Sequence, residues 1–126
     1  MKDLEEIGSK IICAAINVHT HLGPGLLESA YQKCLQYELE SNGMTVAHEV
    51  RLPLVYRDLC IDVGYRMDMV VEDCVLVENK TVDHIAPIHE AQLLTYLRLK
   101  GYRLGYVFNW NVVLMKHGIK RMVNHL

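Results

Sequence analysis

The sequence predicts an α/β fold, in which helices lie on both faces of a central mixed β-sheet. Two observations support this class. Apolar residues recur every three to four positions before Gly43 and alternate with polar residues over most of residues 46–80. The predicted order is helix, helix, three strands, helix and two further strands (α-α-β-β-β-α-β-β), and helices on either side of the strands in the chain can cover both sheet faces.

Two helices are predicted at the start of the chain. Apolar residues from Ile7 to Ile16 keep helical spacing, and the helix they form ends at Gly23-Pro24-Gly25. The second helix runs from Leu26 to about Asn42, and Gly43 supplies the expected stop. Each helix has an apolar side, so we expect both to pack against the sheet.

Alternation of polar and apolar residues then predicts strands over residues 46–56, 61–71 and 75–80. Pro87 suits the first turn of a third helix that runs to Lys100, with Gly101 after it. Residues 104–110 alternate again and predict another strand. A last hairpin is predicted from Val112 to Val123, turning at Lys116-His117-Gly118.

Length and composition indicate one globular domain over residues 1–126, with 51% hydrophobic and 22% charged residues. The apolar runs are far shorter than the ~20 residues that span a bilayer, and the first ten residues lack a secretory apolar segment, so we expect a cytoplasmic protein without a membrane partner. The four cysteines are scattered, which argues against a zinc ribbon or a disulfide framework. The net charge of −2 removes the general attraction to nucleic acid that most of its binders show.

The loop after residue 71 decides where Asp68 and Glu78 point. A two-residue loop, Glu72-Asp73, would send the two carboxylates to opposite faces of the sheet. A three-residue loop, Glu72 to Cys74, places Asp68 directly opposite Glu78 and gathers a wholly apolar second face. That face consists of Met67, Met69, Val71, Val75 and Val77. Burial therefore favours the three-residue loop, which also puts Lys80 on the carboxylate side.

Directly opposed residues in a sheet stand only ~5 Å apart at Cβ, so these two carboxylates would repel each other unless a cation lay between them. Hard oxygen ligands of this kind suit Mg²⁺ or Mn²⁺. A lysine beside them could orient an attacking water or neutralise charge on a phosphate. The alternative is a salt-bridged pair on a half-exposed hairpin, and spacing does not separate the two interpretations.

Two predicted helices offer further polar groups. Glu28 lies three residues before Tyr31 and borders the inward side of the second helix, although a carboxylate in a first turn also simply favours the helix dipole. His89, Gln92 and Tyr96 form an uncharged polar stripe on the third helix. Such stripes are usually solvated, but the lack of charge here is less typical of a solvent-facing side.

Four motifs occur along the chain in this order: Gly25-Leu26-Leu27-Glu28-Ser29-Ala30-Tyr31, Gly64-Tyr65-Arg66-Met67-Asp68, Glu78-Asn79-Lys80 and His89-Glu90-Ala91-Gln92-Leu93-Leu94-Thr95-Tyr96. Together they resemble the GxxExxY proteins, a branch of the PD-(D/E)xK nuclease-like superfamily. The resemblance extends from about Ile7 to Asn124 and implies a restriction-endonuclease-like core. One departure is Met67, which precedes Asp68 where the superfamily pattern has proline.

The resemblance implies a metal-dependent nuclease that hydrolyses phosphodiester bonds of nucleic acid, with DNA favoured. By that likeness Asp68 and Glu78 would bind Mg²⁺ or Mn²⁺ with the carbonyl of Asn79, and Lys80 would serve the attacking water. The candidate catalytic residues are Glu28, Asp68, Glu78, Lys80 and Gln92. The candidate substrate-positioning residues are Tyr31, His89 and Tyr96.

An alternative is a non-catalytic accessory module on the same fold, which binds nucleic acid or a partner protein. The small size and slightly acidic charge favour it. Basic residues late in the chain could form a rim for phosphates, or they could serve solubility. They are Lys100, Arg103, Lys116, Lys120 and Arg121. An exposed terminal hairpin could also support a homodimer.

Overall fold

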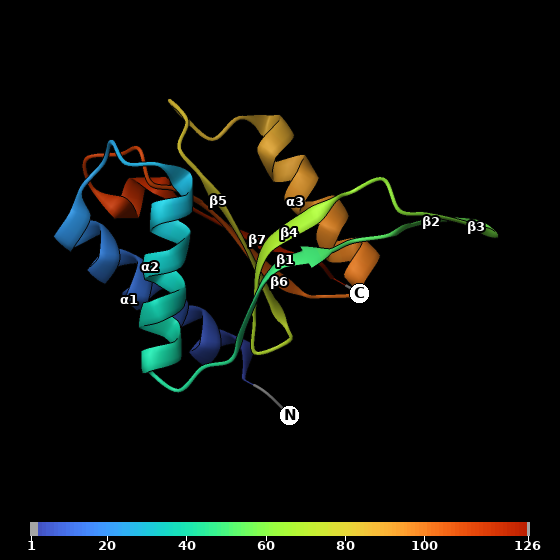
Figure 1. The fold of residues 1–126 in the computed structure, drawn as a ribbon, viewed down its shortest axis with the longest axis horizontal. Coiled ribbons are helices and arrows are strands. Elements are labelled where there is room, and N and C mark those ends of the chain that lie inside the picture. The colour runs from blue at the N-terminus through green and yellow to red at the C-terminus, as the bar shows by residue number, and fades with distance from the viewer. Residues whose placement is uncertain (1–2, 126) are drawn as a thin grey trace.

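A five-stranded mixed sheet forms the centre of the protein, with strand order β1-β4-β5-β6-β7 (Figure 1). The computed structural model describes residues 3–125. Its helices are α1 (Leu4–Leu22), α2 (Glu28–Ser41), α3 (Pro87–Lys100) and the short 3₁₀ helix η1 (Met115–Gly118). Its strands are β1 (Val46–Arg51), β2 (Leu54–Tyr56), β3 (Leu59–Ile61), β4 (Arg66–Val71), β5 (Val75–Lys80), β6 (Leu104–Asn109) and β7 (Ile119–Val123).

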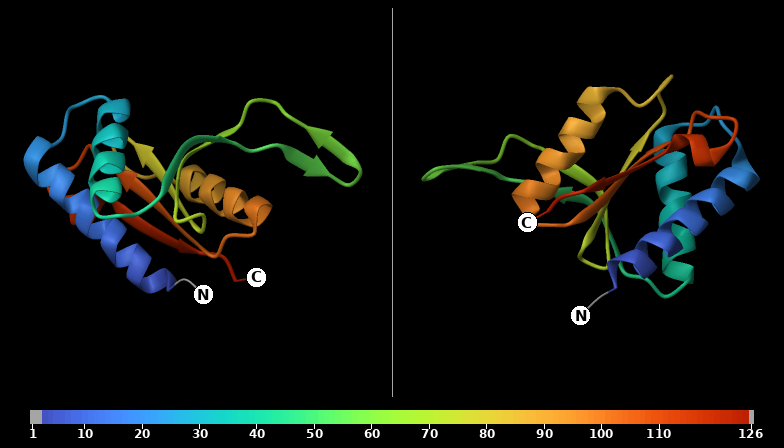
Figure 2. Two further views of the ribbon diagram at one scale, coloured as in Figure 1. Left: turned by 60° about the horizontal axis from the view of Figure 1, so that its bottom comes forward. Right: turned by 180° about the vertical axis from the view of Figure 1, so that it is seen from behind.

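Helices cover both faces of this sheet, which confirms the predicted α/β class and is consistent with a restriction-endonuclease-like core. Helices α1 and α2 lie on one face and α3 on the other (Figure 2). The first face buries Met69, Val71, Val75 and Val77 against the two helices, and the second buries Leu76 and other residues against α3. Among the described residues no helix is both long and apolar enough to cross a membrane.

The β4–β5 hairpin has the three-residue loop that the sequence favours. Val71 pairs with Val75 and Met69 pairs with Val77 in the antiparallel ladder. Met67 is an exception to the predicted apolar face, because it packs in the cluster on the α3 side. The ladder between β4 and β5 ends at Met69, so strict alternation of the two faces does not continue to Met67.

Two of the predicted strands are each broken in two. The strand expected over residues 46–56 divides at Pro53, which has no N–H to donate to a ladder, and the strand expected over residues 61–71 divides near Gly64, whose φ is 89°. The outer pieces, β2 and β3, pair with each other in a separate two-stranded sheet. They form an arm, residues 52–65, that extends away from the five-stranded sheet (Figure 1).

The end of the chain also differs from the prediction. Strand β6 pairs parallel with β5 after the α3 crossover and is buried along its whole length. The expected hairpin from Val112 is wrong, because residues 111–114 are bends that lead into η1. Strand β7 instead pairs antiparallel with β6 at one edge of the main sheet. The hairpin that was expected to support a homodimer is therefore not formed.

Candidate functional site

Asp68 lies where the regular pairing of three strands is interrupted. Pairing between β1 and β4 skips Glu49, which stands opposite Asp68, and pairing between β4 and β5 ends at Met69 and Val77, one step before Glu78. Glu49 has a φ of 50°, a left-handed conformation that costs a non-glycine residue of order 1 kcal/mol. The opening brings carboxylates from three adjacent strands together.

Reciprocal hydrogen bonds fix the two central carboxylates. The main-chain N–H of Asp68 donates to Glu78 Oε2 at 2.7 Å, and the main-chain N–H of Asn79 donates to Asp68 Oδ2 at 2.8 Å. Each carboxylate thus binds the neighbouring strand beyond the point where the ladder ends. Asp68 Oδ1 and Glu78 Oε1 lie outside these two bonds and could face a ligand.

Burial and mutual repulsion dominate the electrostatics of this pair. Burial raises the pKa of Glu78 to about 8, and the adjacent Asp68 carboxylate adds to the rise, whereas the hydrogen bond from Asp68 and the charge of Lys80 oppose it. Burial is also the largest cause of the raised pKa of Asp68, with Glu49 contributing. The side chain of Glu78 is only 4% exposed. Burial and neighbouring carboxylates therefore both favour the protonated forms of this pair, and the charge of Lys80 opposes them.

Glu28 joins this group from the first turn of α2. Its pKa is raised first by partial burial and next by the negative charge of Asp68, and it is lowered by Lys80. The structure therefore brings Glu28 within electrostatic reach of the residues on β4 and β5, although its side chain is exposed.

Helix α3 contributes Tyr96 and Gln92. The Gln92 side-chain amide donates to the Tyr96 hydroxyl at 3.3 Å. Burial raises the pKa of Tyr96, and the carboxylates of Glu78 and Asp68 add to the rise, so its hydroxyl lies near them. The ring of Tyr65 lies tilted against that of Tyr96, with centroids 6.4 Å apart.

The structure does not bring the other two candidate positioning residues directly to the carboxylates. His89 Nδ1 accepts the main-chain N–H of Ala86 at 3.0 Å, an interaction that caps α3. The Tyr31 hydroxyl donates to the Gly23 carbonyl at 2.5 Å and accepts the N–H of Leu26 at 3.1 Å. Tyr31 thus holds the loop that leads into α2 and, through it, the position of Glu28.

Two residues of the site, Glu49 and Gln32, were missed from the sequence. The Gln32 side-chain N–H donates to Glu49 Oε1 at 2.9 Å and approaches the Asp68 carbonyl at 3.4 Å. Gln32 lies one helical turn after Glu28, so helical spacing could have indicated it. Glu49 could have been found from the β1–β4 register, in which it opposes Asp68.

Asn79 anchors the floor of the site. Its side chain is fully buried, and its amide N–H donates to Gln32 Oε1 at 3.4 Å. Its amide oxygen accepts the indole N–H of Trp110 at 2.9 Å, and the Trp110 ring stacks on Tyr31 at a centroid distance of 4.9 Å. The middle residue of the Glu78-Asn79-Lys80 motif thus links α2, β5 and the end of β6.

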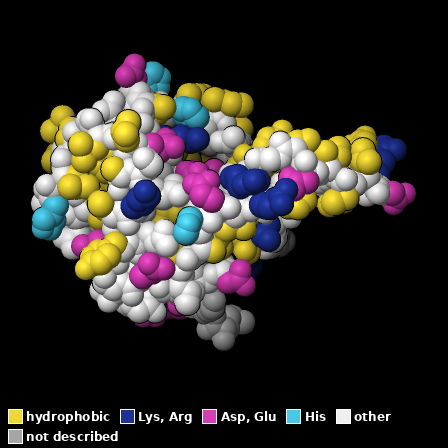
Figure 3. All heavy atoms as spheres, viewed as in Figure 1, with side chains coloured by type: hydrophobic (Ala, Val, Ile, Leu, Met, Phe, Trp, Pro, Cys, Tyr) yellow, Lys and Arg dark blue, Asp and Glu magenta, His cyan; other side chains and the backbone are white. Residues whose placement is uncertain are grey.

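A hollow of about 340 Å³ opens between α2 and the strands beside Asp68. Its lining includes Glu28, Ser29, Gln32, Lys33, Gln36, His48, Glu49 and Asp68. Acidic and basic side chains gather on this side of the molecule, near the base of the arm (Figure 3).

The donor set fits a hard divalent cation. In the described part of the chain, no group of three or more His, Cys, Asp or Glu side chains is arranged to hold a metal. Asp68 and Glu78 nevertheless offer two carboxylates with one oxygen each outside their mutual bonds, and burial is the main cause of their raised pKa values, so a cation bound there would stabilise the ionised forms that burial disfavours.

A family model described as the PD-(D/E)XK nuclease superfamily matches residues 5–122 of the chain. That range contains every candidate site residue. No match was found among curated proteins or among solved structures.

Proposed function

The chain belongs to the PD-(D/E)XK nuclease superfamily, and from that premise we propose that it hydrolyses phosphodiester bonds of nucleic acid, with DNA as the favoured substrate. The observation that carries the proposal is the pair of carboxylates, Asp68 and Glu78, that meet at the opened ladder between β4 and β5. The narrower assignment to the GxxExxY branch rests on the sequence motifs.

Asp68 and Glu78 would hold Mg²⁺ or Mn²⁺ together with the main-chain carbonyl of Asn79, and Glu28 would support the cation from α2. When bound, such a cation supplies Lewis-acid stabilisation of the charge that develops on the phosphate. The protein prepares this site by holding both carboxylates in hydrogen bonds, with Glu78 buried and Asp68 half-buried, before any ligand arrives.

Lys80 supplies the positive charge of the protein itself. It follows Glu78 by two residues on β5, and its charge lowers the pKa of both Asp68 and Glu78, which supports a role beside them. In the proposed reaction its ammonium group orients the attacking water or stabilises charge on the scissile phosphate. Gln92 and Tyr96 are hydrogen-bond donors on α3 that can hold the substrate strand.

The test is cleavage of single-stranded, double-stranded and branched DNA and RNA with Mg²⁺ or Mn²⁺ present. We expect cleavage that a chelator abolishes and that Lys80→Ala slows roughly a hundredfold or more. Lys10→Ala is the matched control, because Lys10 is an exposed lysine on α1 that forms an ion pair with Glu6, and it should cleave normally. Absence of cleavage on every substrate would contradict the proposal and favour an accessory module that binds without cutting.

A further inference from the structure

The arm exposes apolar side chains although it consists of only two strands. Val55, Tyr56 and Leu59 are 61%, 60% and 56% exposed, and apolar side chains run along its length (Figure 3). Strands β2 and β3 pair only with each other among the described strands, so the outer edge of each is open. Both views in Figure 2 show β2 and β3 projecting away from the rest of the protein.

Such an arm needs a partner on physical grounds. A single two-stranded hairpin is at best marginally stable in water, and contiguous exposed apolar surface marks interaction sites. Open strand edges add unpaired N–H and C=O groups that another strand can satisfy. The surface therefore suits a β-strand with apolar side chains.

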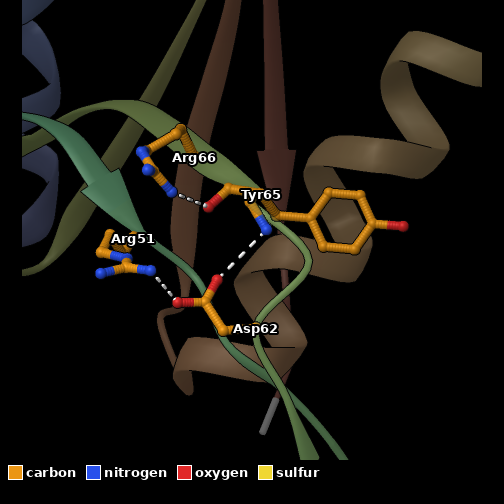
Figure 4. A network of polar contacts seen from close by, with 5 residues as sticks. Arg51, Asp62, Tyr65 and Arg66 are labelled. Carbon is orange, nitrogen blue, oxygen red and sulfur yellow. Dashed lines mark hydrogen bonds and ion pairs between the residues drawn. The ribbon is translucent and has the colours of Figure 1, made fainter.

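The charges on the arm favour protein over nucleic acid. Between residues 52 and 65 the charged residues are Arg57, Asp58 and Asp62, so acidic groups are in excess. At the root of the arm, Asp62 forms an ion pair with Arg51 and accepts the N–H of Gly64, and the guanidinium of Arg66 donates to the Tyr65 carbonyl (Figure 4). A phosphate backbone would meet little free positive charge on this segment.

We propose that the occupant is a second copy of this chain, and that the two β2 strands pair antiparallel about a two-fold axis at Val55. Leu54 then lies opposite the partner's Tyr56. Each β2 already pairs Leu54 with Ile61, Val55 with Cys60 and Tyr56 with Leu59. Self-pairing therefore joins two hairpins into a four-stranded sheet whose three central cross-strand rows are wholly apolar.

Charge selects β2 over β3 as the paired edge. Pairing of β3 with its copy about Cys60 would set Asp58 directly opposite the partner's Asp62, and like charges in opposed positions destabilise a sheet. Pairing through β2 sets Arg57 opposite the partner's Pro53. If the register of β2 and β3 is continued by one residue, the partner's Asp62 lies next in that row. Opposite charges thus flank the apolar rows at both ends.

The inference does not depend on the proposed nuclease activity, and the mass of the protein in solution tests it. By light scattering across a dilution series, we expect the native chain to reach twice its 14.5 kDa mass. Val55→Lys places two ammonium groups face to face at the axis and should reduce the mass to that of one chain. Val113→Lys, at an apolar position that is 86% exposed outside the arm, should leave the dimer intact.

A native chain that stays at 14.5 kDa at every concentration would overturn the inference, and so would a Val55→Lys dimer as stable as the native one. Oxidative crosslinking provides a second readout that does not need the lysine variant to fold. Directly opposed strand residues can form a disulfide. In a Cys60→Ser background, Val55→Cys should crosslink two chains and Val113→Cys should not. Crosslinking of native chains through Cys60, or equal crosslinking of the two variants, would contradict pairing through β2.

Discussion

The β4–β5 hairpin buries most of its side chains, whereas the β2–β3 hairpin exposes most of its apolar ones. The β4–β5 hairpin lies between helices on both faces, and it buries the carboxylate of Glu78. The β2–β3 hairpin projects from the same sheet, and it exposes Val55 and Tyr56. Both hairpins have alternating side chains, but the elements packed around each hairpin decide whether those side chains are buried or exposed.

Cover by helices explains the chemical difference. Burial is the largest cause of the raised pKa values of Asp68 and Glu78, so their ionised forms are disfavoured and a bound cation would stabilise them. Strands β2 and β3 have no such cover among the described elements, and the few charges of the arm lie at its tip and root. One hairpin is therefore suited to hold charge for chemistry, and the other to bury apolar surface in an assembly.

Truncation of one leucine in each hairpin should show the largest difference between the hairpins, measured as the loss in the free energy of unfolding. Leu76 on β5 is fully buried, so Leu76→Ala should lower the free energy of unfolding by ~2–5 kcal/mol. Leu59 on β3 is 56% exposed, so Leu59→Ala should change it by less than about 0.5 kcal/mol in the monomer. Urea unfolding at low protein concentration measures both. Equal losses would mean that the arm is folded into the core of the single chain.

Glu78 should make the metal-free protein less stable as pH rises. Its folded pKa of about 8 exceeds the ordinary glutamate value of 4.5, so the folded state binds the proton more tightly than the unfolded state. The resulting stability is complete below about pH 4.5 and is lost as pH rises through 8, a change of a few kcal/mol at most.

Glu78→Gln should flatten this pH dependence, because an amide does not titrate. Unfolding in a chelator at several pH values would measure it, with Glu40→Gln on the exposed side of α2 as the control. If the two variants keep the same slope with pH, the buried carboxylate is not the source of the dependence.

The smallest expected effect is on Mn²⁺ affinity, when one carboxylate beside the site, Glu49, is compared with one on the arm. Its charge raises the pKa of Asp68 and Glu28, so Glu49→Gln should remove part of the field that attracts a cation and weaken Mn²⁺ binding several-fold, or about 1 kcal/mol. Asp58→Asn removes a carboxylate at the tip of the arm and should leave the affinity unchanged. Titration with Mn²⁺ distinguishes them, and an equal effect of both would indicate only a change in net charge.

The sequence predicts the part of the fold where burial decides between alternatives. An apolar face on β4 and β5 selects the three-residue loop, and the observed pairing of Val71 with Val75 confirms it. The sequence did not predict that Met67 packs on the α3 side. The β4–β5 ladder ends at Met69, and beyond it the Glu78 side chain accepts the main-chain N–H of Asp68. Nor did alternation reveal the breaks near Pro53 and Gly64, since the apolar pattern continues through both.

The sequence predicted those residues of the candidate site that lie within one hairpin or one short motif. Asp68, Glu78 and Lys80 follow from one hairpin register, and Glu28 from a short motif. Helical spacing from Glu28 could have indicated Gln32, whereas Glu49 depends on the pairing of β1 with β4, which residues close in sequence do not specify. Tyr31 belongs to its motif, but its contacts hold a loop.

Calorimetric titration with Mn²⁺ at pH 7 tests the carboxylate site most directly, because it needs no substrate. The native chain should bind one Mn²⁺ and release a proton, since the pKa of about 8 keeps Glu78 largely protonated before binding. Asp68→Asn and Glu78→Gln should each weaken binding at least tenfold, a loss of roughly 1.4 kcal/mol or more. Native affinity in both variants would contradict a cation site on Asp68 and Glu78.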